Sequence, residues 1–346
     1  MAHPVGIVVA LSGVNFINRI MKRIVNAIGM ASMLVACGFA QTPNVKVLPW
    51  NDHLAAVSLT FDDSRPVHLD VAIPELNRRH LHATFFLIVS KTTRLDEWRK
   101  AQSQGHEIGN HSVSHEHSAN LSAETEELQV EDAKKFLDSN FKSDIITFAY
   151  PYTEVSPGLL FWVRRYDFVA RGGRRDGSLV YVKSDVQNDW YNLPSQPSYT
   201  NYDATVYKSW IDKDILMNAW TTFQIHGIGD PSTGYEPIPS DTFIELLDYL
   251  KTAEAKGLWV APFGEVAAYL RAQKILEGAQ AQVANGETKF TWQAPTPFPH
   301  GVVLKVVLNG SPHARLYQAG HELHRNRGGI YSVSFDSREL ILKGEL

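Results

Sequence analysis

The chain alternates between short apolar runs and longer stretches in which apolar residues recur every three or four positions. The first clear run covers residues 55–63 (AAVSLTFDD), where Val57, Leu59 and Phe61 are interleaved with small residues before two adjacent carboxylates. This alternation predicts a buried strand. The same reasoning predicts further strands over residues 82–89, 145–150, 168–170, 220–226 and 258–262. It predicts helices over residues 67–80, 95–104, 122–141, 161–166, 241–256 and 263–273, with Ser122 as an N-cap.

Strands that alternate with helices indicate parallel pairing through βαβ units. Because the alternation recurs about seven times over residues 51–274, it predicts a (β/α) barrel. Polar residues and prolines obscure the pattern over 172–207, so no element is predicted there. From residue 277 the pattern changes to short strands with turn residues, which predicts a small β-rich domain over 285–346. Residues 41–50 are expected to be a linker.

The start of the chain has the pattern of an export signal. Residues 21–40 begin with a charged segment (MKR), continue with an apolar stretch and end in small residues, as secretory signal peptides do. Residues 1–20 would then be an extension upstream of a true start at Met21. Cleavage after Ala40 would release the protein, whereas the lipobox-like LVAC would leave Cys37 lipidated and the protein tethered to a membrane. We favour cleavage; either route predicts a periplasmic, extracellular or outer-membrane protein of a bacterium.

Composition narrows the chemistry that the chain can use. With 346 residues and 44% hydrophobic content, the chain can bury a large core. The net charge of −4 offers no basic field for nucleic acid. Cys37 is the only cysteine, so the globular part has no disulfide, cysteine nucleophile or thiolate ligand. A metal site would therefore use histidine and carboxylate.

Two features suggest such a site. Asp62 and Asp63 end the first predicted strand, and neighbouring carboxylates are costly to desolvate unless a positive group lies beside them. Alone, they are better explained by a solvated turn. His111 and His115 form an H-x-x-x-H pair whose imidazoles can reach one ion. The pair is a weak signal by itself, but together the two features predict a metal site.

Two more predicted strands end in groups that can carry chemistry. One is followed by the aromatic turn FAYPY at 148–152, and the other ends at His226. In a barrel the carboxyl ends of the strands converge on one face, where catalytic residues lie. His226 alone is explained as a structural histidine. Four such strand ends in one chain predict a single active site.

In the order TFDD, HSxxH, FAYPY and IH, these motifs resemble those of the NodB-type polysaccharide deacetylases, carbohydrate esterase family 4, over roughly residues 51–271. The resemblance implies an α/β fold, a distorted (β/α)7 TIM-like barrel. It implies one divalent metal, commonly Zn²⁺, held by three side chains: Asp63, His111 and His115. Asp62 would be the general base and His226 the general acid, while Tyr152 would offer its backbone N–H to the oxyanion. An Asp-His-His set leaves a coordination position open, which suits hydrolysis of an acetyl amide or ester without a covalent nucleophile.

The sequence departs from the family pattern at three places. Many members carry an arginine close to the base in the third motif, where this chain has Ala149 and Tyr150; Arg171, at a neighbouring strand end, is expected to supply that charge. Only the second half of the family's Asp-x-x-Asp-Trp motif is present, as Asp189-Trp190. Gln224 stands where a leucine usually lines the acetate pocket, which predicts a polar pocket wall.

The function expected from the sequence is a secreted, metal-dependent deacetylase acting on a chitin-, peptidoglycan- or xylan-like carbohydrate. Its partner would be the acetylated carbohydrate; nucleic acid is not expected, and membrane contact is expected only if Cys37 is lipidated. Three alternatives remain. A hydrolase of a small non-sugar amide is disfavoured by the export signal, and a non-catalytic carbohydrate-binding relative by the complete set of acid, base and ligands. In the third, the β-rich domain is a glycan-binding module.

Overall fold

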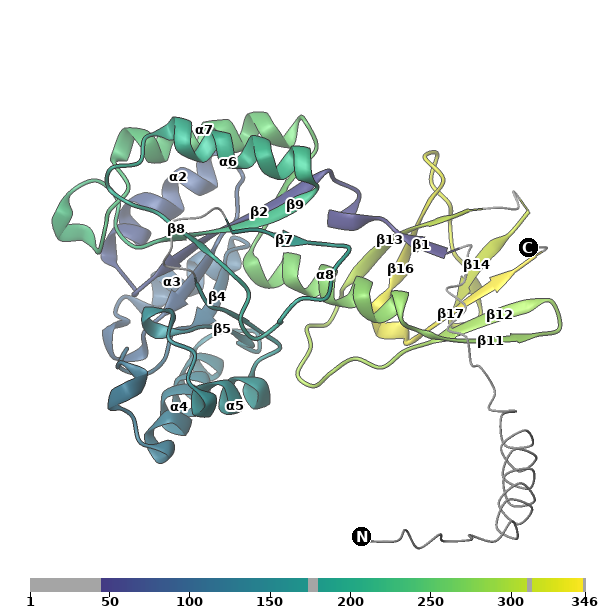
Figure 1. The fold of residues 1–346 in the computed structure, drawn as a ribbon, viewed down its shortest axis with the longest axis horizontal. Coiled ribbons are helices and arrows are strands. Elements are labelled where there is room, and N and C mark those ends of the chain that lie inside the picture. The colour runs from purple at the N-terminus through teal and green to yellow at the C-terminus, as the bar shows by residue number, and fades with distance from the viewer. Residues whose placement is uncertain (1–44, 174–179, 310–312, 345–346) are drawn as a thin grey trace, which may run out of the picture. The chain divides into compact units, whose positions relative to one another are not determined.

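The computed structural model describes residues 45–173, 180–309 and 313–344, which belong to one compact unit, Thr42–Leu346 (Figure 1). The predicted extension and signal peptide, residues 1–40, lie outside the described residues. The helices are α2 (Ile73–Arg78), α3 (Leu95–Ser103), α4 (Ala123–Asn140), α5 (Pro157–Tyr166), α6 (Ala204–Met217), α7 (Ser240–Glu254) and α8 (Phe263–Glu277). The strands of the largest sheet are β2 (Ala55–Asp62), β3 (Thr84–Leu87), β4 (Glu107–Asn110), β5 (Thr147–Ala149), β6 (Val169–Arg171), β7 (Val182–Lys183), β8 (Gln196–Pro197), β9 (Ala219–Ile225) and β10 (Leu258–Val260).

This sheet has the order β6-β5-β4-β3-β2-β9-β7, and among these pairs only β7 on β9 is antiparallel. Strand β10 pairs with the first half of β2. A parallel bridge from Arg171 to Leu193 connects β6 to the segment that leads into β8, and β8 pairs with β9. The sheet therefore curls back on itself with helices around it, which confirms the predicted α/β barrel. Helices α6 and α7 lie side by side on it, as do α4 and α5 (Figure 1).

The side chains of β2 alternate between two environments, as the period of a strand requires. One set packs in the apolar cluster that the helices cover: Val57, Leu59 and Phe61. The other set has polar partners. Ser58 accepts a hydrogen bond from Nε1 of Trp220 at 3.1 Å, and Thr60 donates to the carbonyl of Phe223 at 2.7 Å. Asp62 continues this polar row to the carboxyl end of the strand.

The first predicted helix begins differently from the prediction. The helix expected over 67–80 begins as a π-helical turn, His68–Ala72, before α2. Pro74 has no N–H to donate and its ring crowds the carbonyl of Asp70, so the wider turn relieves that contact. Ser122 caps α4 as predicted, and forms a capping box with Thr125.

Helix α6 is the helix that the sequence pattern did not predict. Its apolar side chains are spread around the helix: Ile211 is buried, whereas Leu216 is 85% exposed. No single face therefore dominates the sequence pattern. Asp203 provides the N-cap by accepting hydrogen bonds from the backbone N–H groups of Thr205 and Val206.

Two further sheets contain the C-terminal strands. The first has the order β1-β13-β16, made of Val45–Val47, Val303–Leu308 and Ile330–Ser334. The second has the order β11-β12-β17-β14-β15, made of Gln280–Ala284, Glu287–Thr291, Glu339–Lys343, Arg315–Gln318 and His321–Glu322. A β-rich C-terminal region is thus present, as predicted. Because β1 pairs antiparallel with β13, the segment expected to be a linker contributes a strand. The domain boundaries themselves stay predictions.

Helix α8 packs against both the barrel and the C-terminal sheets. Its Phe263 meets the rings of Phe86 and Trp220, at 5.9 and 5.6 Å between centroids. The hydroxyl of Tyr269 donates to the carbonyl of Leu48 at 2.6 Å. Among the described residues, none of the helices combines the length and the apolar character needed to cross a membrane.

Candidate metal centre and catalytic site

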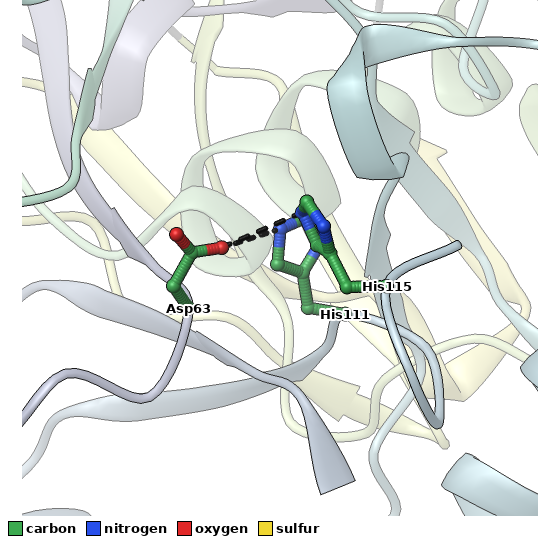
Figure 2. A group of neighbouring side chains, drawn as sticks. All are labelled: Asp63, His111 and His115. Atoms are coloured by element: carbon green, nitrogen blue, oxygen red, sulfur yellow. Dashed lines mark ion pairs between the residues drawn. The ribbon is translucent and has the colours of Figure 1, made fainter. Parts of the chain in front are cut away.

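Three predicted metal ligands lie together at the carboxyl ends of β2 and β4. Asp63 directly follows β2 with a left-handed backbone (φ 81°), and His111 directly follows β4. Oδ1 of Asp63 lies 3.6 Å from Nε2 of His111 and 3.4 Å from Nε2 of His115 (Figure 2). One ligand atom from each residue falls within 4.8 Å of the others. The spacing H-x-x-x-H therefore brings both imidazoles to one carboxylate.

Buried polar side chains hold the loop that carries the two histidines. The amide of Asn110 donates to the carbonyl of Val130 at 3.0 Å, and its Oδ1 accepts from the N–H of Ser112 at 2.9 Å. The hydroxyl of Ser112 in turn accepts from the N–H of His115 at 2.9 Å. Because Ser112 and His115 both have positive φ, the loop folds back on itself within one turn.

The side chains at this position fit a divalent metal. Nδ1 of His111 lies 2.7 Å from the carbonyl of Ala149; the N–H must be there, which leaves Nε2 as the lone-pair nitrogen. Oδ1 of Asp63 is buried and accepts no hydrogen bond from the described residues. One carboxylate oxygen and two imidazole nitrogens are ligands that Zn²⁺ accepts, and the set leaves room for a further ligand.

Electrostatics keep these groups in the protonation state that binds a cation. Burial opposes the charge of Asp63, but His111, His226 and Arg65 hold the pKa of its carboxyl far below the usual value. Burial lowers the pKa of His115 to about 4, so its imidazole is neutral near pH 7. A carboxylate and a neutral imidazole are the forms that coordinate metal.

Asp62, the predicted base, is completely buried beside Asp63. Its Oδ2 accepts from Nη2 of Arg171 at 2.6 Å and from Nε2 of Gln224 at 3.0 Å. Burial alone would raise the pKa of this carboxyl, but Arg171, His111 and His226 lower it below its usual value. The structure thus places Arg171 against Asp62; the catalytic roles of the two residues stay predictions.

His226 follows β9 on the other side of Asp62. Its Nε2 lies 3.8 Å from Oδ2 of Asp62, and burial lowers the pKa of the imidazole. Nε2 of His68 contacts the carbonyl of His226 at 2.6 Å, which fixes the backbone at the strand end. The ring of Tyr235 lies edge-on to His226, at 5.5 Å between centroids. The predicted acid thus lies within 4 Å of the predicted base.

Tyr152 lies beside the predicted ligand His115. Its backbone is left-handed (φ 53°) and its side chain is 40% exposed. The ring meets that of His115 at 4.4 Å and stacks on His117 at 3.6 Å. The aromatic turn therefore abuts the metal ligands, whereas the proposed use of its N–H for an oxyanion stays a prediction.

Sequence reasoning missed Ser195 and the contact of Gln224 with Asp62. Gln224 was expected to line an acyl pocket, yet its amide is bonded to Asp62. Ser195 contacts Gln224. Side chains alternate along a strand, so the two-residue spacing of Gln224 and His226 is the sequence signal that both point to the same face of the sheet. Trp190 packs against the core, with the guanidinium of Arg271 5.7 Å from its ring.

Barrel strands whose carboxyl ends bring a carboxylate pair together with three histidines define an α/β-barrel protein with a candidate metal-dependent hydrolytic site. Residues 51–170 match the family model described as polysaccharide deacetylase. The resemblance inferred from the four motifs is thereby confirmed.

Individual relatives match only part of the chain or of themselves. A peptidoglycan-N-acetylglucosamine deacetylase of Bacillus cereus is 32% identical over 101 residues, which cover 29% of this chain and 46% of that protein. A gellan lyase of a Bacillus species is 23% identical over 248 residues, covering 66% of this chain and 10% of the lyase. The chain thus spans less than half the length of either relative. The crystal structure of a putative polysaccharide deacetylase from Mycobacterium smegmatis has a TM-score of 0.51 at 16% identity, covering 66% of this chain and 94% of that one. This likeness supports the fold.

Proposed function

We propose that the chain is a metal-dependent deacetylase that hydrolyses acetyl amide or ester groups on a carbohydrate polymer or oligosaccharide. The observation that carries the proposal is the cluster at the barrel's carboxyl end, where Asp63, His111 and His115 surround one position beside the buried carboxylate of Asp62. The match of residues 51–170 to the polysaccharide deacetylase family model supports the acetylated carbohydrate as substrate.

In the proposed mechanism each residue has a separate task. A divalent metal held by Asp63, His111 and His115 would supply Lewis-acid chemistry, lowering the pKa of a water molecule and polarising the acyl oxygen. Asp62 takes the proton from the attacking water, and Arg171 keeps it ionised until then. In its protonated form, His226 gives a proton to the leaving amine or alkoxide. The N–H of Tyr152 stabilises the oxyanion.

We propose Zn²⁺ as the metal, because the ligand set of two imidazole nitrogens and one carboxylate is one that catalytic zinc uses. Dialysis of the full chain against a chelator, followed by titration with Zn²⁺, Co²⁺, Ni²⁺ and Mg²⁺, tests this choice. Activity that returns with Mg²⁺ but not with Zn²⁺ would exclude zinc.

The deciding experiment is acetate release by the full chain reconstituted with Zn²⁺. The panel holds chitin oligosaccharides, acetylated xylan and peptidoglycan, each with and without chelator, and Asp62→Asn serves as the inactive control. Acetate that disappears with chelator supports the proposal and identifies the acetyl bond. If zinc binds but no acetate appears, the hydrolase of a small non-sugar amide or a carbohydrate-binding protein replaces it.

We also propose that the chain is exported from a bacterial cell, on the basis of the signal-like residues 21–40. Cell fractionation and the mass of the mature N-terminus test this proposal. A mature chain beginning after Ala40 indicates ordinary secretion, and a lipid-modified Cys37 that is lost in Cys37→Ser indicates an anchored lipoprotein. Retention of residues 1–40 in the cytoplasm would contradict both.

A further inference from the structure

The two oxygens of Asp62 have different partners. Oδ2 accepts two hydrogen bonds, from Nη2 of Arg171 at 2.6 Å and from Nε2 of Gln224 at 3.0 Å. Oδ1 is buried and accepts none from the described residues. Both bonds involve the charged carboxylate and fix its orientation. Oδ2 also lies 3.8 Å from Nε2 of His226 and 4.0 Å from Nε2 of His111.

The orientation of the Gln224 amide is determined by its surroundings. An ionised carboxylate only accepts hydrogen bonds, so the amide must turn its NH₂ group to Asp62 and its oxygen away from it. That oxygen, Oε1, lies 3.3 Å from the hydroxyl of Ser195, which also donates to the carbonyl of Gly172 at 2.7 Å. Ser195 therefore shares its proton between Gln224 and the backbone, and both ends of the amide contact the protein.

This arrangement ties together strands that are far apart in sequence. Asp62 ends β2, Arg171 ends β6, Ser195 lies in the segment entering β8, and Gln224 lies near the end of β9. Arg171 makes a second bond, from Nη1 to Oγ1 of Thr60 at 3.1 Å. The carboxylate is thus held from two sides of the barrel, and its side chain has no freedom to turn toward solvent.

We infer that Gln224 is a positioning residue, which with Arg171 holds Asp62 through Oδ2 in the orientation that the base needs. This inference rests on the proposed deacetylase function. When the water attacks, one of its O–H bonds breaks, the proton goes to the Asp62 carboxylate, and the water oxygen bonds to the acyl carbon. Gln224 is thereby assigned to the base, in place of the polar wall of an acyl pocket that the sequence predicts.

Two substitutions test the inference by different routes. Gln224→Leu keeps a side chain of similar size but removes both amide contacts. Ser195→Ala keeps the amide and its bond to Asp62, but removes the bonds of the serine hydroxyl to the amide oxygen and to the carbonyl of Gly172. We expect kcat to fall roughly 10- to 100-fold in Gln224→Leu, since small displacements of a catalytic group have effects of that order, and by less in Ser195→Ala. KM and Zn²⁺ affinity should change by no more than about 2-fold, because neither residue contacts the proposed ligands.

A double variant and an exposed control make the test specific. If Ser195 acts through Gln224, the double variant should be no slower than Gln224→Leu alone, which is the signature of a shared interaction. Gln280→Leu, the same substitution on an exposed residue of β11, should retain wild-type kinetics. Crystal structures of both single variants should show the Asp62 carboxylate displaced while the three proposed metal ligands keep their positions.

Three results would overturn the inference. One is an unchanged kcat in Gln224→Leu accompanied by a changed preference between acetyl and propionyl substrates, which would return Gln224 to the acyl pocket. Another is additive effects of the two substitutions. The third is an Asp62 carboxylate in its wild-type position in both variant structures. The structures decide even if the wild-type chain releases no acetate, and Ser195→Ala decides if Gln224→Leu does not fold.

Discussion

Asp62 and Asp63 are neighbours with the same side chain, yet their surroundings differ. Asp63 faces two imidazole nitrogens within 3.6 Å, and its other oxygen contacts Arg65 at 2.9 Å. Asp62 faces the guanidinium of Arg171 and the amide of Gln224. Consecutive residues of a strand end point in different directions, so one carboxylate can serve a metal while the other accepts a proton.

Substituting the two carboxylates should therefore separate metal binding from turnover. We expect Asp63→Ala to weaken Zn²⁺ binding by more than about 100-fold, since even groups behind a ligand are worth 10- to 100-fold. Asp62→Asn should keep the metal and lose about 100- to 10,000-fold in kcat, the usual contribution of a general base. Metal content after gel filtration and acetate release measure the two effects. Metal and activity retained in both variants would show that the roles are wrongly assigned.

Arg171 should affect stability as well as activity. Both Arg171 and Asp62 have fully buried side chains, so Arg171→Ala leaves a buried carboxylate that has lost its cation. Breaking such a pair costs about 3–5 kcal/mol of unfolding free energy. We expect Arg171→Ala to show this loss in urea denaturation together with a fall in kcat. Arg78→Ala, at an exposed ion pair, should change stability by less than about 1 kcal/mol.

A stable Arg171→Ala variant with unchanged turnover would mean that the base needs no neighbouring charge. Arg171→Lys separates charge from geometry. A lysine restores the positive charge but cannot donate from two fixed nitrogens to Thr60 and Asp62 together. We expect it to recover part of the lost stability and less of the lost kcat.

Among single residues, the sequence predicts the proposed metal ligands better than the residues that hold the site in place. The proposed ligands and the base belong to contiguous motifs, so short spacing is enough to group them: Asp62 and Asp63, then His111 and His115. The contact of Gln224 with Asp62 joins residues 162 positions apart. It depends on the register of β9 against β2, which local patterns do not determine. Arg171 was predicted only because the third motif lacks the arginine that many family members carry there.

Among the elements, α6 is fastened to β9 through a buried acid. Oδ1 of Asp214 accepts from the hydroxyl of Thr221 at 2.9 Å, and Oδ2 has no hydrogen-bond partner among the described residues. Burial raises the pKa of this carboxyl to about 7, from an ordinary value of 3.8. Near neutral pH, α6 is therefore bonded to β9 through a carboxyl group whose ionisation is opposed by burial.

Asp214→Asn should change how stability depends on pH. Between pH 4 and pH 7 the unfolded chain releases the Asp214 proton while the folded chain keeps it. The contribution of this group to the free energy of unfolding is therefore fully present below about pH 4 and is lost as pH rises through 7. Asparagine has no such proton. We expect the variant to gain on the order of 2–4 kcal/mol relative to the wild type between pH 4 and pH 8. Urea midpoints across this range measure the difference.

The matched control is Asp185→Asn, at an exposed position, which should follow the wild-type pH dependence. Parallel curves for Asp214→Asn and the wild type would show that Asp214 ionises normally in the folded protein. Comparing variant with wild type at each pH removes the contributions of the other buried acids, Glu107 and Asp167, whose pKa values burial also raises.

A helix or strand is easier to predict from sequence when its hydrophobic periodicity is clear. Strand β2 and helix α7 have clear periods and were predicted close to their observed bounds. Helix α6 carries apolar residues on several faces, so its period is blurred. Strand β8 has only two residues, Gln196–Pro197, and exists because β9 offers a partner edge. Elements that are induced by their neighbours leave little trace in the local sequence.

For the molecule as a whole, the barrel was predictable because alternating strands and helices allow few topologies. The pairing of β1 with β13 was not, since it joins Val45 to Leu308 across the whole barrel sequence. A strand of only three residues has too short a sequence pattern to indicate a partner so far away. The C-terminal strands were recognised as a class, but their division into two sheets depends on such long-range pairs.

The last prediction concerns whether barrel and β-rich region unfold together. Leu304 of β13 is fully buried, in the cluster that also contains Phe263 and Leu270 of α8. The N–H of Lys305 donates to the hydroxyl of Tyr269, which itself bonds to the segment after β1. Removing part of the β-rich region would therefore expose apolar surface on α8, whose other side supports the barrel.

Leu304→Ala should accordingly destabilise the entire unit. The cavity left by a buried leucine costs about 2–5 kcal/mol, and Val303→Ala, at a residue 42% exposed, should cost less than about 0.5 kcal/mol. We expect one urea transition in both variants, with tryptophan fluorescence and acetate release lost at the same midpoint. In Leu304→Ala that midpoint should lie well below the wild type. Acetate release that survives a first fluorescence transition would show that the barrel is stable alone, and the β-rich region would then be an independent module, as a glycan-binding role requires.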